Sequence, residues 1–238
     1  MSESALKKTN QEAYVVAPPA IVALPVEGSD QLFPVNRVFC IGRNYAAHAV
    51  EMGHDPDKEP PFFFLKSAGN VAGGGEFPYP SETSDVHHEI EMVVGLAKGG
   101  VNISVDDALD HVYGYGLGLD MTRRDLQAEA KKLGRPWEVA KAFEKSAPCG
   151  ALVPASRIGH PAEGAVTLDV NGERRQAGNL NQMIWKVPEM IAILSDYFEL
   201  QPGDLIMTGT PSGVNAITRG DTMVGRIEGV GEISVRVV

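Results

Sequence analysis

Two glutamates separated by one residue, Glu89 and Glu91, stand in a run (residues 85–96) that becomes apolar from Ile90 onward. We predict that the whole run is a strand, so that side chains two apart share a face and both carboxylates point the same way. A solvated acidic strand edge is the simpler interpretation of such a pair. The apolar continuation, however, indicates burial, and buried charges need partners. We therefore expect a divalent cation that prefers oxygen ligands, provided that a third ligand lies elsewhere.

A third carboxylate, Asp120, follows a stretch in which glycine occupies alternate positions, at Gly114, Gly116 and Gly118. This pattern predicts a strand with one bare face, which another sheet or backbone can approach closely. Asp120 would stand at the end of that strand and is our candidate for the third metal ligand.

Residues 122–125 resemble a helix capping box, and Gly134 is placed to end the helix that they begin. Arg124 and Gln127 are one turn apart in this predicted helix, and we expect them to face the same pocket as Asp120. An arginine and a helix N-terminus both favour an anion at that position.

A possible general base is formed by His48 and Glu51, which are three residues apart on a predicted short helix. Asn44 would cap this helix and Gly53 would close it. A carboxylate beside an imidazole orients it and raises its basicity, although such pairs are also common on plain surfaces. The proline-rich loop that follows (residues 53–61) could let the helix move as a lid.

Three more polar side chains have candidate roles. Lys66 ends the apolar run 62–65 and is either a lysine that extends its amine to solvent or a ligand for an anion. Lys141 has apolar neighbours, which predicts a buried amine. Thr210 lies in a loop bracketed by Gly209 and Gly213, where backbone and hydroxyl could approach a ligand closely, although a plain tight turn would look the same.

The composition restricts the class of protein. The chain has 238 residues, a net charge of -10 and no apolar run long enough to cross a bilayer. The charge argues against general binding of nucleic acid or anionic membranes. The two cysteines, Cys40 and Cys149, provide no disulfide framework and suit a reducing compartment. The polar first residues lack the apolar segment of a signal peptide, so we expect a cytoplasmic protein.

The pattern of elements favours a β-rich α+β fold, because many short strands alternate with few helices. Asn171-Gly172 predicts a hairpin within residues 166–176, and residues 188–198 predict a helix with Pro188 in its first turn. Residues 1 to about 12 are expected to be a frayed tail. Prolines in residues 14–26 favour short edge strands over a helix.

Four motifs together carry a family resemblance: residues 42–45 followed by His48 and Glu51, then residues 87–91, 119–125 and 208–213. Their order resembles the fumarylacetoacetate hydrolase family, especially its short acylpyruvate and fumarylpyruvate hydrolase members. The resemblance covers roughly residues 35–238. It implies a catalytic domain over residues 35–238, of the mixed β-roll type found in the family's C-terminal domain. Residues 1–34 would form an N-terminal tail and short edge strands.

The resemblance also implies a homodimer and a set of functional residues. Mg2+ or Mn2+ would be held by Glu89, Glu91 and Asp120. The catalytic group, in which the lid histidine and glutamate activate water, would consist of His48, Glu51 and Lys141. The substrate-binding positions would be Lys66, Arg124, Gln127 and Thr210.

The activity that follows is metal-dependent hydrolysis of a carbon–carbon bond in a 2,4-diketo acid. Similarity favours fumarylpyruvate, which yields fumarate and pyruvate in aromatic catabolism. Two alternatives use the same head group: oxaloacetate decarboxylation, and isomerisation or decarboxylation of 2-hydroxyhepta-2,4-diene-1,7-dioate. The pair His48 and Glu51 favours hydrolysis, because decarboxylation needs no activated water. A non-catalytic module that binds a metal and a dicarboxylate is a further alternative.

Overall fold

The computed structural model describes residues 14–51 and 61–238, apart from the side chains of residues 48–50. The predicted N-terminal tail and nearly all of the predicted loop at residues 53–61 therefore lie outside the described residues. No helix in the described ranges is long and apolar enough to cross a membrane.

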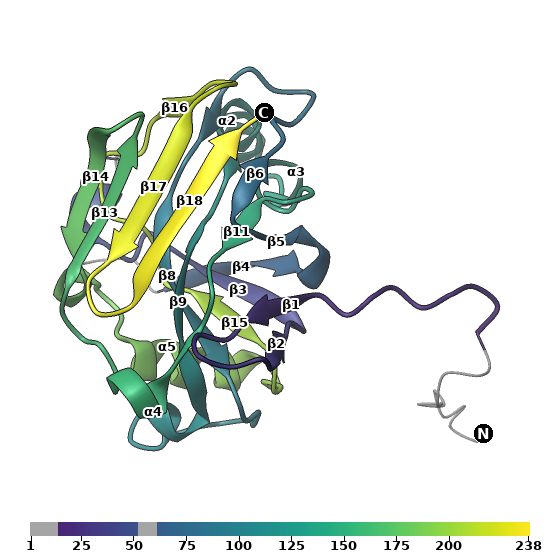
Figure 1. The fold of residues 1–238 in the computed structure, drawn as a ribbon, viewed down its shortest axis with the longest axis vertical. Coiled ribbons are helices and arrows are strands. Elements are labelled where there is room, and N and C mark those ends of the chain that lie inside the picture. Colours follow the sequence, from purple (N-terminus) through teal and green to yellow (C-terminus); the bar gives the residue numbers. More distant parts are fainter. Residues whose placement is uncertain (1–13, 52–60) are drawn as a thin grey trace.

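Short strands outnumber helices in the described chain, as the sequence pattern predicts, and they make four sheets (Figure 1). The largest sheet has the order β4-β3-β15-β8-β9-β11-β5, with β12 paired to β9. Its strands are β3 (Arg37–Gly42), β4 (Phe62–Ser67), β5 (Val71–Gly73), β8 (Ile90–Leu96), β9 (Val112–Leu119), β11 (Ala147–Cys149), β12 (Val153–Pro154) and β15 (Leu205–Met207).

A five-stranded sheet packs against the long strands β8 and β9 (Figure 1). Its order is β14-β13-β17-β18-β6, and the hairpin of β13 and β14 turns at Asn171-Gly172, as predicted. Its strands are β6 (Gly75–Phe77), β13 (Ala165–Val170), β14 (Glu173–Asn179), β17 (Thr222–Ile227) and β18 (Gly231–Val237). Ile90, Leu117, Leu168 and Ile233 belong to the apolar core that joins the two sheets.

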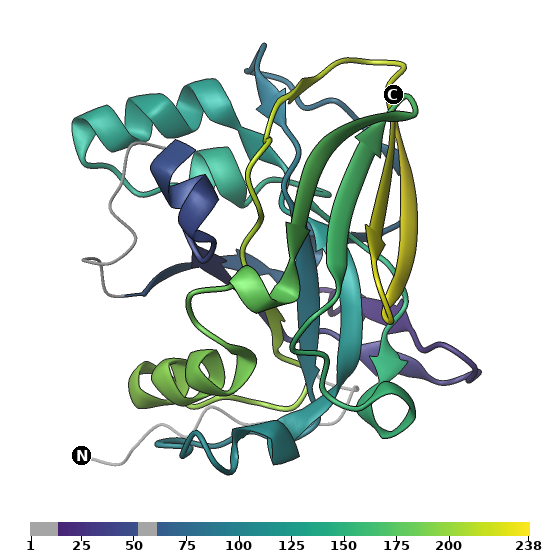
Figure 2. The same ribbon diagram turned by 90° about the vertical axis from the view of Figure 1, so that its left-hand side faces the viewer.

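Helices α1, α2, α3 and α5 lie on the side of the long strands away from the five-stranded sheet (Figure 2). The predicted helix at residues 188–198 is α5, shifted by one residue. The helices are α1 (Ala46–Glu51), α2 (Arg124–Leu133), α3 (Glu138–Lys141), α4 (Ala155–Ile158) and α5 (Val187–Tyr197), with short 3-10 turns at Ala68–Asn70, Ala108–His111 and Leu180–Gln182. This content of elements is the β-rich α+β fold expected from the sequence.

The run 85–96 is two strands and not one, which corrects the prediction. β7 (Val86–His87) pairs with β10 (Thr122–Arg123) and β16 (Ala216–Ile217), whereas β8 pairs with β9 and β15. The chain changes sheet at His88 and Glu89, and the Glu89 carbonyl accepts a hydrogen bond from the Asp120 amide at 2.8 Å. This break holds Glu89 beside the end of β9.

The glycine-striped strand is β9, and its bare face is covered from within the chain. A Cβ at Gly114 would lie 2.3 Å from the Val153 carbonyl oxygen, and one at Gly116 would lie 3.0 Å from the Ala151 carbonyl oxygen. The stripe therefore permits β12 and the segment before it to lie against β9. It gives no support for a dimer contact.

Two predicted helix caps are wrong, because their side chains bind elsewhere. Thr122 belongs to β10, and its hydroxyl accepts a hydrogen bond from the Lys141 amine at 2.6 Å. The side-chain amide of Asn44 donates to the Trp185 and Thr208 carbonyls and accepts a hydrogen bond from the Trp185 backbone amide. Gly134 does end α2, in a left-handed conformation with φ of 61°.

The proline-rich N-terminal segment forms a small antiparallel sheet of β1 (Ala23–Pro25) and β2 (Leu32–Pro34), in line with the predicted edge strands. Leu24, Phe33 and Val35 share an apolar cluster with the two cysteines, which are free and buried. The boundary at residue 34/35 stays a prediction.

The packing of β9 makes a testable prediction. Replacing Gly114 with Ala would force a methyl group into the Val153 backbone, and overpacking of this kind lowers the free energy of unfolding by about 1 to 3 kcal/mol. Gly73→Ala is the matched control, since its Cβ would meet nothing within 4 Å. Urea unfolding of the two variants decides the matter: equal stability of both would contradict close packing at β9.

Candidate metal centre and active site

Three buried carboxylates meet where β8 begins and β9 ends. Glu89, Glu91 and Asp120 each offer an oxygen, and these three oxygens lie within 4.8 Å of one another. Burial raises the pKa of Glu91 well above its usual value, and the neighbouring charges of Asp120 and Glu89 raise it further. Such crowded oxygens fit a hard divalent cation, which would relieve their mutual repulsion.

Lys141 at the end of α3 binds two of the three carboxylates. Its amine donates to Glu89 Oε2 at 2.9 Å, to Asp120 Oδ2 at 2.7 Å and to the Thr122 hydroxyl at 2.6 Å. Burial by itself would lower the pKa of Lys141, but the charges of Asp120 and Glu89 outweigh it and raise the pKa. The lysine is therefore a buried ammonium, as its apolar sequence neighbours predicted, and it is in place to stabilise negative charge.

Lys66 lies behind this group. Its amine is 2.9 Å from Asp120 Oδ1 and also donates to the Ser146 hydroxyl and the Lys141 carbonyl. Only 1% of the residue is exposed, so it does not extend its amine to solvent. It is absent from the cavity wall that the described residues form. A direct substrate contact of Lys66 thus stays a prediction, while its visible contacts hold Asp120 and the α3 end in place.

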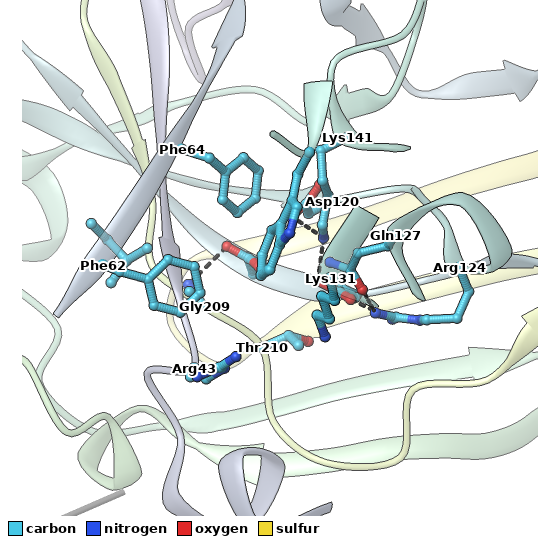
Figure 3. Close-up of a pocket in the computed structure, with 15 residues that line it drawn as sticks. Arg43, Phe62, Phe64, Asp120, Arg124, Gln127, Lys131, Lys141, Gly209 and Thr210 are labelled. Carbon is cyan, nitrogen blue, oxygen red and sulfur yellow. Dashed lines mark hydrogen bonds and ion pairs between the residues drawn. The ribbon is translucent and has the colours of Figure 1, made fainter. Parts of the chain in front are cut away.

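Helix α2 brings Arg124 and Gln127 to the same cavity (Figure 3). The Arg124 guanidinium donates to Glu89 Oε1 and, at 2.7 Å, to Gln127 Oε1. The Arg124 amide donates to the Asp85 carbonyl, and the Leu126 amide to the Asp125 side chain. These two backbone amides already donate within the chain. Helix α2 therefore offers a ligand its side chains and not these amides.

The glycine-bracketed loop after β15 also reaches the carboxylates. The Gly209 amide donates to Glu91 Oε2 at 2.8 Å. Gly209 has φ of 91°, and a Cβ there would lie 2.7 Å from the Asn44 side chain, so glycine is required. Thr210 follows it and lines the cavity.

A buried glutamine that the sequence analysis missed orients Thr210. Gln176 on β14 donates from its amide nitrogen to the Thr210 hydroxyl oxygen at 2.8 Å, while its amide oxygen lies 2.8 Å from His88 Nδ1. Burial lowers the pKa of His88 to about 4, so the ring is neutral and Nδ1 donates. The Thr210 hydroxyl oxygen thus accepts a hydrogen bond from Gln176. The hydrogen of this hydroxyl can therefore be donated to a ligand in the cavity. Nothing in a hairpin sequence distinguishes such a glutamine from a solvated one.

The cavity lined by these residues also has an aromatic wall (Figure 3). The wall consists of Phe62, Phe64 and Trp137, and the rings of Phe62 and Trp137 meet edge to face at 5.4 Å. Arg43 and Lys131 also line it. Sequence patterns alone predict no site role for these five residues.

The predicted general base is described only in part. His48 lies within α1, but its side chain is outside the described residues. Glu51 is exposed, and its carboxylate accepts a hydrogen bond from the Gly213 amide at 3.2 Å, which joins the end of α1 to the loop that carries Thr210. The assigned roles of His48 and Glu51 therefore stay predictions.

The comparisons with known proteins agree on one family. Residues 37–238 match the family model for the fumarylacetoacetate (FAA) hydrolase C-terminal domain. A fumarylpyruvate hydrolase of Ralstonia sp. is 47% identical over 189 residues, which cover 78% of this chain and 98% of that protein. A mitochondrial oxaloacetate decarboxylase of Dictyostelium discoideum is 40% identical over 196 residues, or 82% of this chain and 87% of that protein.

A solved structure is also similar. The crystal structure of fumarylpyruvate hydrolase from Pseudomonas aeruginosa, in complex with Mn2+ and pyruvate, superposes with a TM-score of 0.94. Its sequence is 55% identical, and the match covers 95% of this chain and 99% of that chain.

The carboxylate cluster predicts the response to metal. Glu91→Gln keeps the side-chain shape but removes one anionic ligand, so we expect the affinity for Mn2+ to fall at least about tenfold. The control is Glu173→Gln, an exposed glutamate far from the cluster in sequence and paired with Arg175. Calorimetric titration with Mn2+ measures both, and wild-type affinity in Glu91→Gln would show that this carboxylate is not a ligand.

Proposed function

The chain belongs to the fumarylacetoacetate hydrolase family, and we propose that it hydrolyses the bond between the fumaryl carbonyl carbon and the methylene group of fumarylpyruvate, giving fumarate and pyruvate. One observation supports this most strongly. Three buried carboxylates and a buried ammonium share a cavity with Arg124, Gln127 and Thr210. The crystal structure of the similar enzyme from Pseudomonas aeruginosa is a complex with Mn2+ and pyruvate. Pyruvate is one of the two products of the reaction that we propose.

The metal that we assign to this site is Mg2+ or Mn2+, held by Glu89, Glu91 and Asp120. When bound, it supplies Lewis-acid polarisation of the pyruvoyl oxygens and fixes their orientation. Arg124, Gln127 and Thr210 provide donors for the carboxylate and keto oxygens of this head. Lys66 acts on the head through its contact with Asp120.

The bond-breaking step requires an activated water and a group that stabilises the negative charge of the enolate. His48, oriented by Glu51, takes a proton from water as the oxygen attacks the carbonyl carbon of the fumaryl group. The bond from that carbon to the neighbouring methylene then breaks, and its electron pair becomes the enolate of pyruvate. Lys141, a buried ammonium, stabilises this negative charge. Return of a proton to the methylene carbon completes pyruvate.

Oxaloacetate decarboxylation is the second candidate, and the similarity to the Dictyostelium discoideum decarboxylase favours it. The same site would stabilise the same enolate after loss of carbon dioxide, but without activated water. Isomerisation or decarboxylation of the hydroxyhepta-dienedioate, and ligand binding without turnover, are further outcomes of the same assay. A panel of fumarylpyruvate, oxaloacetate and the dienedioate, with Mg2+ and with Mn2+, tests the proposal. Release of fumarate with pyruvate at the highest kcat/KM is the expected result.

The proposed general base distinguishes hydrolysis of fumarylpyruvate from decarboxylation of oxaloacetate, because only hydrolysis needs an activated water. We expect His48→Ala to lower kcat for fumarylpyruvate by about two to four orders of magnitude, because general-base loss has this cost. KM should change little, since His48 is not among the proposed ligands of the pyruvoyl head. Glu51→Gln should lose less, because Glu51 orients and does not transfer the proton. Oxaloacetate turnover in both variants is the internal control, and unchanged hydrolysis in His48→Ala would remove this residue from the mechanism.

We further propose that the protein is a cytoplasmic homodimer that acts in aromatic catabolism. The family resemblance supports the dimer, whereas the glycine stripe of β9 is covered within the chain. Light scattering at assay concentration should give twice the mass of the 25.5 kDa chain. A mass of one chain would contradict the dimer.

A further inference from the structure

Two cations of the cavity, Arg43 and Lys131, have no task in binding the pyruvoyl head. Both line the cavity together with the three carboxylates. In Figure 3 their side chains end on either side of Thr210, away from Lys141.

Helix α2 sets the distance between the two ends of the cavity. Arg124, Gln127 and Lys131 lie at positions i, i+3 and i+7 of this helix, so they share one face. Seven residues correspond to a rise of roughly 10 Å along the helix. Arg124 contacts Glu89 at the metal end. The Lys131 backbone is therefore two turns from that of Arg124, and its side chain lines the same cavity.

Lys131 is a cation beside an aromatic ring and other cations. Its amine lies 5.2 Å from the centre of the Trp137 ring, and in the described part of the chain no carboxylate forms an ion pair with it. Burial and the nearby charges of Arg124 and Arg43 lower the pKa of Lys131 to about 8. An anion bound beside Lys131 would relieve the repulsion from these neighbouring cations.

Arg43 is held toward the cavity by an unusual backbone. It has φ of 57°, a conformation that costs free energy for a residue with a Cβ and that is concentrated at functional sites. Its guanidinium packs over the Phe62 ring at 5.0 Å. Phe62 also contacts Trp137, so one aromatic surface carries both cations.

We propose that Lys131 and Arg43 bind a second carboxylate at the far end of the acyl chain, and so select acylpyruvates with an acidic tail. The proposal deepens the proposed function and rests on it for the position of the pyruvoyl head. An apolar or uncharged tail would leave Lys131 partly desolvated and unpaired. A terminal carboxylate would pair with it, and Arg43 can hold the same group with its planar donors.

Binding of two unreactive 2-oxo acids tests the proposal in the metal-loaded protein. 2-Oxopimelate and 2-oxoheptanoate have the same chain length and head, and only the first has a terminal carboxylate. We expect the wild type to prefer 2-oxopimelate by about ten- to a hundredfold, the contribution of a charge-assisted pair. Lys131→Met should remove most of this preference and leave the affinity for 2-oxoheptanoate within a few-fold. Lys131→Arg is the matched control that retains the charge, and Arg43→Met should act in the same direction as Lys131→Met.

The preference should also depend on pH. Arg124 on α2, Arg43 after β3, Glu89 and Lys141 are the charged groups that act on Lys131. Lys131 is protonated below a pH of about 8 and loses its charge above it, so the preference for 2-oxopimelate should fall as the pH rises through that value. In Lys131→Arg the preference should persist. The ratio of the two affinities cancels ionisations that act on the shared head.

The outcomes separate this proposal from the proposed function. No preference for 2-oxopimelate in the wild type, or an equal loss of both ligands in Lys131→Met, would overturn the carboxylate site. A preserved preference without cleavage of fumarylpyruvate would support the carboxylate site and overturn the hydrolase. Cleavage of acetylpyruvate and fumarylpyruvate with the same kcat/KM would contradict selection by the tail.

Discussion

The structure depends on one cluster of buried charges. Glu89, Glu91 and Asp120 place three carboxylates within 4.8 Å at the end of two core strands, and the fold surrounds them with Lys141, Lys66 and Arg124. Carboxylates in such surroundings repel one another and lose hydration, so the cluster is stable only with compensating cations. Lys141, Lys66 and Arg124 supply such positive charge, and we propose that a divalent cation adds to it.

Several irregular features of the fold serve this cluster. The break between β7 and β8 positions Glu89, the left-handed turn at Gly209 aims an amide at Glu91, and the bare face of β9 lets neighbouring backbone lie close. Gln176 holds the Thr210 hydroxyl through a hydrogen bond, and Lys66 holds Asp120 through an ion pair. These contacts hold the side chains at the carboxylate end of the cavity in place.

The sequence predicts the local features well and the long-range ones less well. Hydrophobic alternation and turn residues were sufficient for the β-rich fold, the hairpin at Asn171-Gly172 and helix α5. They also brought Glu89, Glu91 and Asp120 into one candidate site. The change of sheet at His88 was beyond local patterns, because it depends on which distant strands pair with β7 and β8. The capping box at Thr122 failed for the same reason: its hydroxyl binds Lys141, a tertiary contact.

Lys131 and Gln176 show a second limit. A lysine on an amphipathic helix and a glutamine in a hairpin have the sequence pattern of solvated residues, and only the assembled cavity shows that each faces the ligand or its neighbours. The resemblance to a family gave the proposed catalytic residues, whereas the cations that we propose to bind the tail became visible through geometry and charge.

The most direct test of the central claim follows the oxygen of water. Hydrolysis through His48 requires that the new carboxylate of fumarate contain an oxygen atom from solvent. In water enriched in oxygen-18, the metal-loaded protein should convert fumarylpyruvate to pyruvate and fumarate with a single solvent oxygen in each fumarate, as measured by mass spectrometry after brief reaction. Unlabelled fumarate, or release of carbon dioxide without fumarate, would contradict the account.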